Sequence, residues 1–213
     1  DFIRWTLDAL WIKNVQNSIQ APQYMDIEEQ RKVVFEYLRL VQLVNATSAQ
    51  IDRIYADPEI SDPDQAALEL NNRLRNLKSM EDRLKPIAES VLQFQVSVTV
   101  AKLGLGLAGQ PIPPVLYHVS RLPNALIVSP RDVIRQDENI SLMPEMTTEE
   151  IVNLESSVEK KLNVSALVVP VGGIGTYPTM VMSTTDLNWL VEVVSHEWTH
   201  NFLTLHPLGL KDR

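Results

Sequence analysis

Residues 186–205 read DLNWLVEVVSHEWTHNFLTL and contain the most informative pattern in the chain. His196 and His200 are four residues apart, so on a helix they lie about 40° apart around the axis and about one turn along it. Both imidazoles can therefore reach one metal ion, and imidazole is a good zinc ligand. Glu197 points about 100° away from His196, so it can act as a general base on a water at the metal without itself occupying the metal. This stretch predicts a helix that carries a zinc site.

The surroundings of the motif favour a zinc site over two unrelated histidines on an ordinary helix. A chance HExxH in a chain of this composition has a probability of about half a percent. The residues just before the motif are apolar and would bury one side of the helix: Leu190, Val191, Val193 and Val194. One side of the helix is then fixed in the core, and the histidines lie on another.

The segment VVSHEWTHNFL, residues 193–203, resembles the active-site helix of the zincin metallopeptidases, and their gluzincin form in particular. The resemblance covers roughly residues 115–205 and is specific across His196–His200. It implies a backing helix, a small twisted sheet and an exposed edge strand before the motif helix. Residues 148–162, 164–171 and 179–183 can fill these roles in that order.

The family resemblance also implies a substrate and a way of binding it. An extended peptide would add to the edge strand by strand addition, with contacts at Thr179, Met180 and Val181. Zinc would be the cofactor, and Glu197 would be the general base in hydrolysis of the peptide bond. The opposing hypothesis is an inactive zincin-like scaffold or interaction protein that works through its N-terminal helices.

A catalytic zinc usually has three protein ligands and one open position, so the histidine pair leaves one ligand to find. The gluzincin pattern takes it from a helix well downstream, which implies a ligand beyond Arg213 and makes the ending KDR read as a truncation. His206 lies ten residues after His196, as in the metzincin pattern HExxHxxGxxH. We predict that His206 does not bind, because Leu203 replaces the glycine of that pattern and left-handed leucine costs about 1–2 kcal/mol. Asp212 and an upstream carboxylate are the remaining alternatives.

The composition is that of an ordinary globular protein, with 45% hydrophobic and 22% charged residues. The net charge of -8 argues against a nucleic-acid partner, because phosphate binding needs clustered Lys and Arg. The absence of cysteine excludes disulfides and thiolate metal ligands. The chain starts at Asp1 without Met, so we expect a removed upstream segment, and through it a membrane-tethered, extracytoplasmic location.

Residues 1–108 are predicted to form a helical domain. The opening DFIRWTLDALWI places Phe2, Trp5, Ala9 and Ile12 on one helical face, which favours a helix that covers a core over one at a membrane interface. Heptad rows over 26–56 and 64–103, joined by a short connector with two prolines, predict a long antiparallel coiled-coil-like hairpin.

The segment LGLGLAGQPIPP, residues 103–114, contains strong helix breakers and predicts a domain boundary. Beyond it the pattern is mixed, with strands at 115–119, 125–129, 139–143, 164–171 and 179–183, and a helix opened by the capping box TTEE at 147–150. The predicted fold class is therefore α+β, with a zincin-like subdomain at 115–213. His118 and Tyr177 are interpreted as structural residues, and the glycines of GGIGT, residues 172–176, as the basis of a tight loop beside the cleft.

Overall fold

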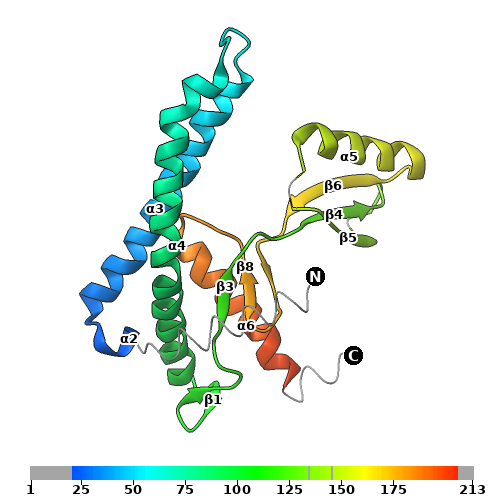
Figure 1. Ribbon diagram of the computed structural model, residues 1–213. Coiled ribbons are helices and arrows are strands. Elements are labelled where there is room, and N and C mark those ends of the chain that lie inside the picture. Colours follow the sequence, from blue (N-terminus) through cyan, green and yellow to red (C-terminus); the bar gives the residue numbers. More distant parts are fainter. Residues whose placement is uncertain (1–20, 134, 145, 206–213) are drawn as a thin grey trace.

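The computed structural model describes residues 21–133, 135–144 and 146–205 and has a mixed α and β architecture (Figure 1). Its first half is helical, with the short helix α2 (Ala21–Tyr24) followed by α3 (Ile27–Ala56) and α4 (Pro63–Lys102). The predicted hairpin is confirmed, and its tip projects away from the rest of the molecule. None of the helices in the described part is long and apolar enough to cross a bilayer.

Local sequence accounts for the ends of the hairpin helices. Asp26 accepts the amide of Glu29, and the Glu29 side chain accepts the amide of Asp26, which is a complete capping box for α3. Asp62 caps α4 in the same position, and Pro63 follows as its first residue, where no amide is needed. Helix α4 continues through Pro86 without interruption.

The second half contains two three-stranded sheets and a two-stranded hairpin of β1 (Gly106–Leu107) and β2 (Gln110–Pro111). One sheet has the order β3-β8-β7, formed by Tyr117–Val119, Thr179–Val181 and Gly173–Ile174. The other has the order β5-β4-β6, formed by Glu138–Leu142, Asn124–Ser129 and Ser165–Pro170. Helix α5 (Thr148–Leu162) lies beside β6, and α6 (Leu187–Thr204) lies against β7 and β8.

The strand positions agree with the predicted ranges, but their arrangement corrects two expectations. The strand at 164–171 and the strand at 179–183 belong to different sheets. Strand β8 is not an edge strand either, because it pairs in parallel with β3 on one side and antiparallel with β7 on the other. In the part of the chain that the structure describes, the outer strands of this sheet are therefore β3 and β7.

One hydrophobic core joins the two halves of the chain. It contains side chains of α3 and α4, such as Val41 and Val91, together with Tyr117, Val181 and Val194 from the second half. The predicted boundary at residues 103–114 thus separates two kinds of secondary structure that share this core. A smaller cluster of Leu126, Val128 and Ala166 lies between α5 and its sheet.

Two outer strands have their free amides bound by a neighbouring helix. The amides of Tyr117 and Val119 in β3 donate to Gln93 Oε1 at 3.0 Å and to Glu89 Oε1 at 2.8 Å, both on α4. Helix α5 does the same for β6: Glu155 Oε1 accepts the Val168 amide at 2.7 Å, and Glu159 Oε1 accepts the Ala166 amide at 3.3 Å. These contacts fix α4 on one sheet and α5 on the other.

Candidate metal centre

Helix α6 is held in one orientation by its cap and its buried face. The Asp186 side chain accepts the amides of Asn188 and Trp189 at 2.8 and 3.2 Å, which starts the helix. Leu190, Val194 and Trp198, spaced four residues apart, are buried. The Trp198 indole also donates to the carbonyl of Pro113 at 2.8 Å. Because this face is fixed in the core, the side chains of His196 and His200 are exposed.

The two motif histidines converge at their outer nitrogens. His196 Nε2 and His200 Nε2 are 3.1 Å apart, and the rings stand edge to face with centroids 4.8 Å apart. Two nitrogens bound at 2.0–2.1 Å to a tetrahedral zinc are about 3.3 Å apart. The pair is thus spaced almost as a shared zinc ion requires. Without a metal, the same distance is a hydrogen bond in which one ring donates.

Glu197 lies directly under the glycine-rich strand β7. A Cβ atom placed on Gly173 would be 2.8 Å from Glu197 Cγ and 2.9 Å from Glu197 Oε1. One placed on Gly175 would be 3.2 Å from Glu197 Oε2 and 3.3 Å from His200 Cβ. The glycines let the backbone of residues 173–175 pass over the carboxylate. The sequence predicted a tight loop here, whereas the structure has the short strand β7 at Gly173–Ile174, paired with β8.

Asn201 ties this loop to the motif helix. Its Nδ2 donates to the carbonyl of Thr176 at 3.0 Å and to the carbonyl of Glu197 at 3.2 Å. The sequence analysis did not identify Asn201. The available signal was its spacing, because it follows Glu197 by four residues and so lies one turn further on the same side of the helix.

A third candidate ligand beside His196 and His200 was not found among the described residues. In that part of the chain no group of three or more His, Cys, Asp or Glu side chains is placed to hold a metal ion. His206 and Asp212 lie outside the described residues, as does the ligand expected beyond Arg213. The donor set formed by His196 and His200 fits two positions of a zinc site.

The expectation that Thr179, Met180 and Val181 form an exposed edge strand is wrong. Their exposed fractions are 1%, 7% and 0%, and both sides of β8 are already paired. The physical reason is that β8 pairs in parallel with β3, a strand about sixty residues earlier in the sequence. This pairing makes β8 the central strand, so β7 is an outer strand of the sheet. An extended ligand beside Glu197 would meet Gly173 and Ile174 instead.

Two further polar residues have structural partners. His118 Nδ1 lies 3.0 Å from Glu89 Oε1, and the strand register places His118 with Met180 and Ile174, on the face opposite to Gly173 and α6. The Tyr177 hydroxyl donates to the carbonyl of Pro114 at 3.2 Å, and burial raises the pKa of this phenol. Both contacts agree with the structural interpretation of these residues.

Comparisons of the chain with protein-family models, with curated proteins and with solved structures found no match.

Proposed function

We propose that this chain is a zincin-like metallopeptidase in which His196 and His200 hold zinc and Glu197 is the general base. The observation that carries the proposal is the 3.1 Å spacing of the two Nε2 atoms, next to a carboxylate that lies under the outer strand β7. A third protein ligand would complete the site. We propose peptide as the substrate because, within residues 21–133, 135–144 and 146–205, the outer edge of β7 beside Glu197 is unpaired.

The roles follow from the positions of the side chains. Zinc, when bound, supplies Lewis acidity toward a carbonyl oxygen and lowers the pKa of water. Glu197 would take a proton from the attacking water and pass it to the leaving amine. Gly173 and Ile174 would hold an extended peptide by backbone hydrogen bonds, and the missing side chain of Gly173 lets this strand pack directly against Glu197. The hydrogen bond from Asn201 to the carbonyl of Thr176 fixes the distance between the segment after β7 and helix α6.

The decisive substitution is Glu197→Gln, compared with Glu192→Gln as the matched control. Glu192 is an exposed residue on the same helix, so the control makes the same chemical change away from the histidines. We expect Glu197→Gln to retain zinc, measured as metal content of the full-length protein, and to lose nearly all cleavage of a mixed peptide library, because an amide cannot accept the proton. Full activity in this variant would remove Glu197 from the mechanism.

Substitution of the ligands separates metal binding from chemistry. We expect His196→Ala and His200→Ala to lose both zinc and cleavage, since the two remaining ligands cannot hold the ion tightly. Cleavage that continues in the presence of a chelator would contradict the role of zinc. A folded full-length protein that binds no zinc would favour the inactive scaffold that works through the hairpin.

A further inference from the structure

A short hairpin at one end of the molecule exposes a group of large apolar side chains. It follows α4, contains β1 and β2, and comprises residues 103–112, here called the leucine hairpin. Strand β1 lies at the end of α4 opposite to the tip of the long helical hairpin (Figure 1). Four large apolar side chains of the leucine hairpin are between 37% and 70% exposed: Leu103, Leu105, Leu107 and Ile112. Single exposed apolar residues are ordinary, but a group of them marks a binding surface.

The leucine hairpin offers a partner almost no polar groups. Residues 103–117 contain no Asp, Glu, Lys, Arg or His, although 22% of the chain is charged. Gln110 is the only residue with a polar side chain between Leu103 and Leu116. A protein interface has a polar rim and about one hydrogen bond per 100–200 Å², which this surface cannot supply. An uncharged apolar protrusion suits the boundary of a bilayer, where binding scales with the buried apolar area.

Much of the backbone here is already hydrogen-bonded within the protein. Three amides donate to carbonyls in the last turn of α4 at 3.0–3.2 Å: those of Leu103, Gly104 and Leu105. Strands β1 and β2 pair with each other, and Pro111 has no amide hydrogen. Unpaired backbone groups are the main obstacle to placing a chain in lipid. The hairpin therefore meets a requirement that an irregular loop would not meet.

The shape of the hairpin is fixed at its tip and at its root. Ala108 and Gly109 have φ angles of 51° and 78°, and positive φ at both central residues is what a tight two-residue hairpin turn requires. At the root, the Trp198 indole of α6 donates to the carbonyl of Pro113 at 2.8 Å. Insertion of the tip into a surface would therefore hold the motif helix at a fixed distance from that surface.

We propose that the leucine hairpin inserts its apolar side chains into the surface of a lipid bilayer. Lys102, which is exposed just before the hairpin, can keep its ammonium group at the level of the headgroups while the leucines lie deeper. The lipid is a zwitterionic one, because the chain has a net charge of -8 and an anionic surface would repel it. Insertion requires neither catalysis nor a bound metal.

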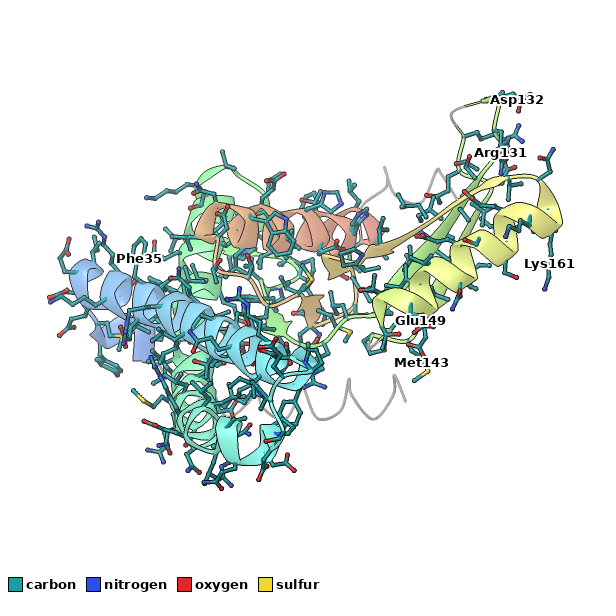
Figure 2. The ribbon with its side chains drawn as sticks, turned by 90° about the horizontal axis from the view of Figure 1, so that it is seen from above. Phe35, Arg131, Asp132, Met143, Glu149 and Lys161 are labelled. Carbon is teal, nitrogen blue, oxygen red and sulfur yellow. The ribbon has the colours of Figure 1, made fainter. Side chains whose placement is uncertain are left out.

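Site-directed labelling of the full chain tests the insertion. The protein has no cysteine, so one introduced thiol reports one position. The test variant is Leu107→Cys, and the matched control is Met143→Cys, at a residue that is 76% exposed and lies beside α5 (Figure 2). Each carries a nitrobenzoxadiazole label and is mixed with phosphatidylcholine vesicles that contain nitroxide-labelled acyl chains. We expect the nitroxide to quench the label at position 107 at least about five times more strongly than the label at position 143, because only the hairpin reaches the acyl chains.

A charged side chain at the tip should abolish the binding. We expect Leu107→Asp to reduce the fraction of protein that floats with phosphatidylcholine vesicles at least about tenfold, and Met143→Asp to leave this fraction unchanged. Leu103→Asp, at a second exposed leucine, repeats the test if the first variant does not fold. Added sodium chloride should not change the binding of the parent protein, because the hairpin has no charge to screen.

Each other result overturns the proposal. A parent protein that does not float has no such surface. Equal quenching at positions 107 and 143 would mean adsorption without a preferred face, and unchanged flotation of both Asp variants of the hairpin would place the attachment elsewhere in the chain. Binding that falls with salt, or that rises with phosphatidylglycerol in the vesicles, would indicate an electrostatic attachment. A dimer that Leu107→Asp dissociates would place the hairpin against a second copy.

Discussion

At Gly173 the backbone of β7 lies so close to α6 that a single methyl group has no room. An added Cβ would be 2.7 Å from Val193 Cγ1 and 2.8 Å from Glu197 Cγ, which is well inside van der Waals contact. The closest neighbours belong to α6, and Val193 packs against the hydrophobic core, so little relaxation is available. This glycine therefore sets the distance between strand β7 and the proposed base.

We expect Gly173→Ala to reduce the free energy of unfolding by about 1–3 kcal/mol, the usual cost of overpacking, and to reduce peptide cleavage through displacement of Glu197. The matched comparison is Gly175→Ala, whose Cβ would be 3.2 Å from Glu197 Oε2, at the end of a side chain that can move slightly. We expect this variant to lose less than about 1 kcal/mol. Urea unfolding of the two variants measures the difference, and equal stability would contradict the close approach.

Residue-level prediction worked where the relevant geometry is local. The convergence of His196 and His200 follows from helical spacing alone, and the nitrogens are indeed 3.1 Å apart. The contacts of Gly173 with Glu197 and of Asn201 with Thr176 were not predictable, because they join α6 to a strand whose pairing is decided elsewhere in the fold. A sequence contains no local signal for the height of a loop above a helix.

At the level of elements, α5 is attached to its sheet by two carboxylates at the edge of β6. Glu155 and Glu159 accept the amides of Val168 and Ala166. We expect the double change Glu155→Ala with Glu159→Ala to reduce the free energy of unfolding by about 1–3 kcal/mol, because two strand amides lose their acceptors. Hydrogen exchange at these two amides should accelerate together.

The control for this prediction is Asn153→Ala, an exposed position on the same helix. Alanine has the higher helix propensity, so this variant should be as stable as the parent or slightly more stable. Unchanged exchange at Val168 in the double variant would show that the carboxylates do not hold the edge of β6.

The elements themselves were predictable to different degrees. Helices α3, α4 and α5 were identified within a few residues, because caps such as Asp26 and Thr147 and an apolar periodicity are written into adjacent residues. The strand ranges were also close, but the position of β8 in its sheet was not. Strand pairing joins Tyr117 to Thr179, and no local pattern specifies a partner sixty residues away.

In the whole molecule, two buried tyrosines lie near a buried carboxylate in the core that joins the two halves of the chain. Tyr37 on α3 and Tyr117 on β3 are 2% and 1% exposed, and Glu89 is fully buried. Burial raises the pKa of both phenols above their ordinary value, and the charge of Glu89 raises it further. The folded protein therefore keeps both phenols protonated at a pH where the unfolded chain loses these protons.

This difference predicts a loss of stability in alkali. Above about pH 10 the folded state binds more protons than the unfolded state, so stability falls as pH rises, by up to about 1.4 kcal/mol per pH unit for each phenol. We expect that the free energy of unfolding of Tyr37→Phe, measured with urea, decreases less between about pH 8 and pH 11 than that of the parent protein. Tyr24→Phe, at a residue 80% exposed, is the control and should leave the fall unchanged. An equal fall in both variants would exclude Tyr37 as a cause.

The pairing of a helix with the edge of a strand depends on two repeat lengths that almost coincide. Four helical residues advance about 6.0 Å and two strand residues about 6.6 Å, so acceptors four apart on α4 or α5 reach alternate amides of β3 or β6. Each further four residues along the helix would turn the side chain by about another 40° away from the strand, so a helix can accept only two amides in this way. Strand β3 has just two on this side, and the next position on β6 is Pro170, which has no amide hydrogen. Among the described residues, the edges of the two three-stranded sheets that remain unpaired are therefore those at β5 and β7.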